Sequence, residues 1–138
     1  MKKAALIFGI FLMALTAQAQ EETVTVKVTI ENVLNDNGTI IAALHTSETF
    51  MKGNGIVDLE EKAKAGTVTL TFEDVKPGTY AIMVLHDEND NQRMDFEANG
   101  MPKENYGMST NEMIMGPPTF SDAQFDVTNE NLEFSIRF

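Results

Sequence analysis

Residues 86–95, HDENDNQRMD, carry oxygen-bearing side chains at the spacing of a calcium-binding loop. When Asp87 is counted as position one, the residues follow a D-x-N-x-N pattern, which directs side-chain oxygens from alternate residues towards one centre. Position seven then supplies a backbone carbonyl and position nine a carboxylate, and hard oxygen donors of this kind suit Ca²⁺. The predicted ligands are Asp87, Asn89, Asn91, Arg93 through its carbonyl, and Asp95.

Two positions depart from the usual pattern of such a loop. Position six, where a sharp turn favours Gly, is Gln92, and position twelve, where a bidentate Glu normally completes the ligand set, is Ala98. Glu97 and Glu104 are the candidates to replace that missing carboxylate. The alternative interpretation is a solvated turn, since Asn and Asp favour turns by bonding their own backbone. The spacing alone leaves both interpretations open.

A second candidate chemistry uses sulfur. Thioethers are soft ligands for copper(I), so Met113 and Met115, together with His86 or His45, would give an exported copper(I)-binding sandwich. The simpler interpretation is that flexible methionine side chains fill apolar gaps beneath a long loop. The methionines of this region are Met94, Met101, Met108, Met113 and Met115.

Catalysis has little support in the sequence, and we predict no catalytic residues. The chain has no cysteine, no G-x-S-x-G or H-E-x-x-H pattern and no Gly-rich phosphate loop. His86 and Asp87 are neighbours, but adjacent residues of a strand point to opposite faces and cannot act as a base and its orienting carboxylate. His86 is predicted to bond a loop backbone at the end of its strand. A small hydrolase is retained only as an alternative.

The first nineteen residues have the composition of a signal peptide. Lys2 and Lys3 precede an apolar run, and Ala17-Gln18-Ala19 matches a signal peptidase site, so cleavage is predicted after Ala19. Without cysteine the chain cannot be a lipoprotein, and we expect a periplasmic or secreted protein. Residues 20–138 have the length of one domain.

The charge balance narrows the class of partner. The chain has 10 Lys and Arg against 21 Asp and Glu, a net charge of −11, which becomes −13 without Lys2 and Lys3. Phosphate binding requires clustered basic side chains, so nucleic acid is excluded as the expected partner. The apolar run is too short to anchor the protein in a bilayer. We therefore expect a protein or glycan partner and no membrane insertion.

Alternation of apolar and polar residues predicts strands over 23–30, 39–46, 67–73, 79–86 and 132–138. Asn37-Gly38 predicts a hairpin that pairs the second strand with the first. Residues 47–66 are expected to form a loop with one short helix ending at Gly66, and residues 87–118 a long loop. The predicted fold is all-β, an antiparallel Greek-key β-sandwich of immunoglobulin-like or transthyretin-like type with six or seven strands.

Three motifs between residues 72 and 111 resemble a family of small exported bacterial proteins catalogued as a domain of unknown function. They are a P-G-T-Y turn, an H-D-x-N strand end and a G-x-P-x-x-x-Y-G segment followed by Ser and Asn. Family members often carry Gly where this chain has Gln92. The resemblance implies no known activity, and the P-G-T-Y strand is also similar to transthyretin-like and carboxypeptidase-regulatory-like sandwiches. The matching residues are Pro77, Gly78, Thr79, Tyr80, His86, Asp87, Asn89, Gly100, Pro102, Tyr106, Gly107, Ser109 and Asn111.

Overall fold

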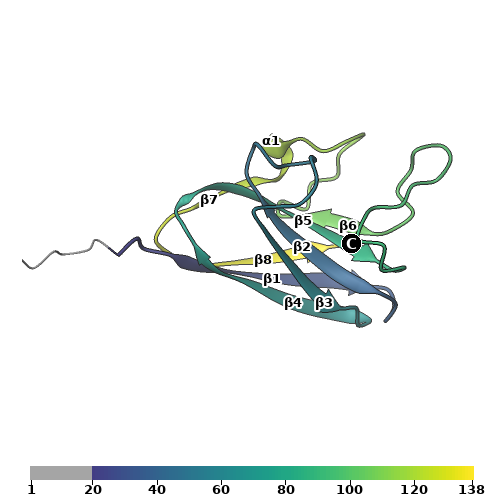
Figure 1. Ribbon diagram of the computed structural model, residues 1–138, viewed down its shortest axis with the longest axis horizontal. Helices are drawn as coiled ribbons and strands as arrows, with labels where there is room; N and C mark the ends of the chain where they lie inside the picture. The colour runs from purple at the N-terminus through teal and green to yellow at the C-terminus, as the bar shows by residue number, and fades with distance from the viewer. Residues whose placement is uncertain (1–19) are drawn as a thin grey trace, which may run out of the picture.

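The computed structural model describes residues 20–138, and the predicted signal peptide lies outside the described residues. Two β-sheets pack face to face (Figure 1). One has the order β4-β1-β8, and the other has the order β3-β2-β5-β6, with β7 also paired to β5. The elements are β1 (Val24–Val33), β2 (Thr39–His45), β3 (Val57–Lys62), β4 (Gly66–Val75), β5 (Gly78–Asp87), β6 (Tyr106–Met108), α1 (Phe120–Ala123), β7 (Gln124–Val127) and β8 (Leu132–Arg137).

The alternating strands bury their apolar positions between the two sheets. In β1, Val26, Val28 and Ile30 are fully buried, whereas Lys27 between them is exposed. The facing sheet contributes Ile40 and Val84 among others to the same core. These residues confirm the predicted all-β sandwich, because a period of two places every second side chain on the buried face.

The predicted hairpin around Asn37-Gly38 is wrong. β1 pairs with β4 and with β8, and β2 pairs with β3 and β5, so residues 34–38 cross from one sheet to the other. Both hydrogen-bonding edges of β1 are occupied by strands distant in sequence, which leaves no edge for β2. The β1–β8 pair is parallel, although the other pairs are antiparallel as predicted.

The prediction of a short helix before Gly66 is also wrong. The segment VDLEEK forms edge strand β3, and the helix of the described chain is α1, near the C-terminus. The local preference of Glu and Lys for helix is overridden by backbone pairing with β2. Exposed charges on an edge strand also oppose pairing with other chains. Strands β6 and β7 were not predicted either, and residues 20–138 form eight strands where six or seven were expected.

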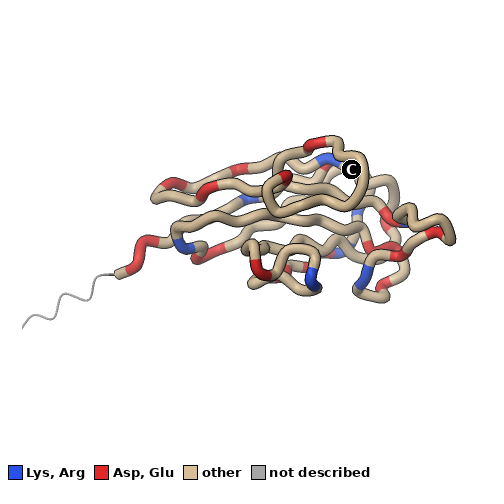
Figure 2. The backbone as a smooth tube through the Cα atoms, turned by 90° about the horizontal axis from the view of Figure 1, so that it is seen from above, with Lys and Arg blue, Asp and Glu red and all other residues tan. Residues whose placement is uncertain are grey.

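Charge is distributed over both layers of the sandwich. Figure 2 shows Asp and Glu positions along the whole described chain, while the fewer Lys and Arg positions do not gather in one patch. Within residues 20–138, every helix is too short to cross a membrane. The C-terminus lies beside β6 (Figure 1), and the ring of Phe138 stacks on His86 with centroids 6.2 Å apart.

Candidate metal centre

The acidic loop begins where β5 ends, and a buried carboxylate folds it back on itself. Asp87 is the last residue of β5 and is fully buried. Its Oδ1 accepts a hydrogen bond from the Asn91 backbone N–H at 3.2 Å, and its Oδ2 accepts one from the Gln92 N–H at 2.7 Å. The first predicted ligand therefore organises the turn by bonding amides at positions five and six.

The residue at position six adopts the backbone conformation that a calcium loop normally assigns to Gly. Gln92 has φ 62°, in the left-handed region, and Asp90 has φ 56°. A non-glycine residue pays about 1–2 kcal/mol for this conformation. The sharp turn is thus formed despite Gln92, which removes one of the two departures from the expected pattern.

Three of the predicted ligand side chains meet. The Asn89 side-chain amide donates to Asp95 Oδ2 at 2.6 Å, and the Asn91 amide donates to Asp95 Oδ1 and Oδ2 at 2.9 and 2.8 Å. The oxygens of both amides accept backbone N–H groups, those of Asn91 and Arg93 at 3.2 and 3.1 Å. A cation in contact with Asp95 would therefore require the amides to turn their oxygens towards it.

Glu104, one of the two candidates to complete the ligand set, holds the two ends of the loop together. It is 7% exposed, and its two carboxylate oxygens accept the backbone N–H groups of Glu88 at 3.0 Å and Asp95 at 3.2 Å. Glu97 instead lies in a small hairpin bridged by Phe96 and Pro102, where its backbone bonds Met101 and Gly100. The structure brings Glu104, and not Glu97, into hydrogen-bonding contact with the loop.

The donor set carries little charge. Within residues 20–138, no group of three or more His, Asp or Glu side chains is arranged to hold a metal ion. The loop would offer the Asp87 and Asp95 carboxylates, two amides and the Arg93 carbonyl. Because affinity for Ca²⁺ depends on the number of charged ligands and on the rigidity of the site, this set corresponds to a weak site.

Asp95 is expected to titrate below its ordinary pKa. Hydrogen bonds from the side chains of Asn89 and then Asn91 lower the pKa of Asp95. Because the folded-state pKa is depressed, this contribution to stability is present above the ordinary pKa and is lost as the pH falls through the folded value. We predict that Asn89→Ala raises the Asp95 pKa, as measured by carboxyl NMR titration in chelator.

The control for this titration is Asn35→Ala, because the Asn35 side chain donates to Glu88 instead of Asp95. The Asp95 pKa should be the same in this variant as in the parent. An Asp95 pKa that Asn89→Ala leaves unchanged would contradict the hydrogen-bonded cluster.

The histidines and methionines of the copper interpretation have contrasting environments. His86 is buried, and its Nε2 lies 2.7 Å from the Asn37 carbonyl oxygen, so the ring bonds a loop backbone as predicted. His45 is buried beside Thr49, with its Nδ1 3.1 Å from Oγ1, and burial lowers the pKa of His45. Met113 and Met115 are fully exposed.

Several motif residues that sequence reasoning did not interpret join parts of the sandwich. The Asn111 side chain bonds the β8 backbone twice, donating to Ser135 O at 2.6 Å and accepting from Arg137 N at 2.8 Å. The Ser109 hydroxyl bonds the Ala123 carbonyl and accepts the Ile82 N–H. These contacts give the Tyr-Gly-x-Ser-x-Asn segment a structural role, since Asn111 joins it to β8 and Ser109 joins it to α1 and β5.

Comparison with known proteins agrees with the resemblance seen in the motifs. A family described as "Uncharacterized protein conserved in bacteria (DUF2141)" matches residues 28–135, which include all eight strands except the first residues of β1 and the last of β8. No curated protein and no solved structure shows significant similarity to the chain. Since the match covers most of the sequence, the chain belongs to the DUF2141 family of uncharacterised proteins conserved in bacteria.

Proposed function

We propose that this protein is an exported β-sandwich module with a binding or structural role, stabilised by Ca²⁺ in the loop Asp87–Asp95. The observation that carries the proposal is the convergence of Asn89 and Asn91 on Asp95 in a loop whose turn is organised by buried Asp87. Export rests on the predicted signal peptide. No catalytic activity is proposed, since no recognisable nucleophile and base pair occurs in the sequence.

In this proposal Asp95 is the main charged ligand. The Asn89 and Asn91 side chains would turn their amide oxygens to the ion, and the Arg93 carbonyl would be a further ligand. Glu104 keeps Asp95 in place through the Asp95 backbone N–H. Extracellular modules with sites of this kind bind Ca²⁺ with dissociation constants of about 0.1–1 mM.

The ion would act by ordering the segment between β5 and β6. A loop held on a rigid sheet is how sandwich folds commonly present binding residues. The role of Ca²⁺ is therefore structural, and the partner would contact surfaces of the domain other than the ion itself.

The test is equilibrium unfolding of residues 20–138 in chelator and in Ca²⁺. With a dissociation constant of about 0.1 mM, Ca²⁺ at about 10 mM should raise the free energy of unfolding by about 2.7 kcal/mol. Asp95→Asn should abolish this gain because it removes the main charged ligand. Glu130→Gln, an exposed carboxylate beyond β7, makes the same change in charge and should retain the gain.

The result that overturns the proposal is an unchanged stability in Ca²⁺, which would leave the loop as a solvated turn. The second part of the experiment repeats the unfolding measurement in copper(I) under reducing conditions. A stabilisation by copper(I) that is lost when Met113 and Met115 are changed together to Leu would replace the calcium site with the copper interpretation.

A further inference from the structure

One row of apolar side chains crosses the outer face of the larger sheet. The register places Ile41 of β2 opposite Leu85 of β5, and Leu85 opposite Tyr106 of β6. Paired residues on neighbouring strands share a face, so the three side chains lie side by side. We call Ile41, Leu85 and Tyr106 the apolar row. All three are half-buried, and they belong neither to the central core nor to the second apolar cluster of the described chain.

The apolar row is partly covered and lies outside the cluster that buries the neighbouring positions of this face. The preceding positions on the same side of β5, Ala81 and Met83, pack in the second cluster with Phe50 and Phe120. The following position on that side is Asp87, where the acidic loop begins. Figure 1 shows the segment between β2 and β3 and helix α1 rising above the sheet, and the loop after β5 rising elsewhere on the same side. Leu85, the β5 member of the apolar row, lies between these two groups.

Carboxylates border the apolar row on the edge strand. Glu60 of β3 is opposite Ile41, and Asp58 is opposite Ala43, so both lie on the face that carries the row. Both are exposed. The apolar row therefore has a strip of negative charge at its β3 end.

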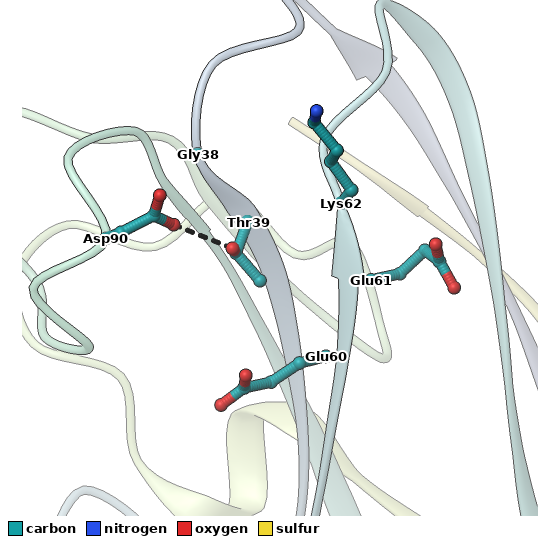
Figure 3. Close-up of a pocket in the computed structure, with 6 residues that line it drawn as sticks. All are labelled: Gly38, Thr39, Glu60, Glu61, Lys62 and Asp90. Carbon is teal, nitrogen blue, oxygen red and sulfur yellow. Dashed lines mark hydrogen bonds between the residues drawn. The ribbon is translucent and has the colours of Figure 1, made fainter.

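A recess adjoins this acidic border. It has a volume of about 380 Å³ and is lined by Gly38, Thr39, Glu60, Glu61, Lys62 and Asp90. Figure 3 shows the Glu60 and Asp90 side chains on one side of β3 and Glu61 extending to the other. Asp90 is held by a hydrogen bond from the Thr39 hydroxyl at 2.7 Å. Because Glu61 extends away, the recess has the Glu60 and Asp90 carboxylates against the Lys62 ammonium, so a cation is still favoured there.

We propose that the apolar row and its acidic border form a docking surface for a cationic amphipathic segment of another protein. Apolar side chains of the partner cover Ile41, Leu85 and Tyr106. A Lys or Arg of the partner enters the recess between Glu60 and Asp90, while neighbouring cations face Asp58. Burial supplies affinity, and the charges select the partner and accelerate its association.

Charge complementarity favours such a partner over a second copy of this chain. Two copies packed with their β3 strands facing each other would bring Glu60 and Asp58 of both copies together, and like charges across an interface are costly. The net charge of −11 adds to this repulsion. The apolar row and its acidic border are built from strands, and only Asp90 of the recess comes from the loop of the calcium proposal, so most of the surface is independent of that proposal.

The experiment uses two short peptides as probes, one alternating lysine with leucine and the other alternating glutamate with leucine. Binding to the mature protein is measured by calorimetry at physiological ionic strength, in chelator. The lysine peptide should bind, and the double variant Asp58→Asn with Glu60→Gln should weaken it about fivefold, since it removes two surface charge pairs. The matched control is Glu73→Gln with Glu133→Gln, which removes the same charge from exposed positions of the other sheet and should leave binding unchanged.

Ile41→Thr tests the apolar contribution, because Thr keeps the branched shape suited to a strand and removes apolar area. It should also weaken the lysine peptide several-fold, whereas Leu34→Thr, which changes an exposed residue outside the strands, should not. The inference is overturned if the control pair weakens binding as much as Asp58→Asn with Glu60→Gln, if the glutamate peptide binds equally well, or if neither peptide binds. Self-association in sedimentation that Ile41→Thr abolishes would identify a second copy as the occupant and also overturn it.

Discussion

Gly38→Ala is expected to lower the free energy of unfolding by about 4 kcal/mol, the range reached by core overpacking and backbone strain combined. Gly38 has φ 68°, and a Cβ there would lie 1.9 Å from the Asp87 carbonyl oxygen and 2.7 Å from Glu88 Cα. Both are backbone atoms that cannot rotate away. Either the crossing segment or the start of the acidic loop must move, with loss of the contact between His86 and Asn37 O.

The control is Gly100→Ala, which separates steric conflict from backbone conformation. Gly100 has a similar positive φ of 84°, but no atom lies within 4 Å of its added Cβ. Its substitution should cost about 1 kcal/mol. Denaturant unfolding of both variants gives the comparison. Similar losses would show that the left-handed conformation alone, and not the approach to Asp87, requires Gly38.

Asp87→Ala is expected to cost about 3 kcal/mol in chelator, because it leaves two loop N–H groups without their shared acceptor at a fully buried position. In Ca²⁺ the free energy of unfolding of Asp87→Ala should fall further below that of the parent protein. The added difference should equal the stabilisation that Ca²⁺ gives the parent, because the variant lacks a ligand. Measuring both conditions separates the turn-forming role of Asp87 from its role as a ligand.

The matched control for this prediction is Asp36→Ala. Asp36 also accepts a backbone N–H, that of Ala65 at 2.7 Å, but it is exposed. Water can replace that bond, so the cost should stay below about 1 kcal/mol. A loss for Asp87→Ala no larger than that for Asp36→Ala would mean that the loop reorganises without its buried carboxylate.

In the acidic loop, local sequence patterns predicted some of the side-chain contacts and not others. The D-x-N-x-N spacing predicted that side-chain oxygens gather around one centre, and the side chains of Asn89 and Asn91 do meet at Asp95, although they present their amide N–H groups to it and not their oxygens. Spacing did not show whether Glu97 or Glu104 contacts the loop. The answer depends on a hairpin that holds Glu97 apart from the loop and brings Glu104 back to the Asp95 backbone N–H. Gln92 adopts a left-handed backbone conformation that local preference assigns to Gly. The hydrogen bond from its N–H to buried Asp87 holds it there.

Local patterns were enough to predict the all-β class, five of the strands and a turn rich in Asn and Asp after β5, since alternation and short-range hydrogen bonding act over a few residues. The position of β1 between β4 and β8, the edge strand VDLEEK and the bonds from Asn111 to β8 depend instead on contacts between distant segments. The apolar row likewise exists only through register, which brings Ile41, Leu85 and Tyr106 together from three strands. Strand pairing depends on which distant edges are free and which faces can be buried together, and no local pattern contains that information.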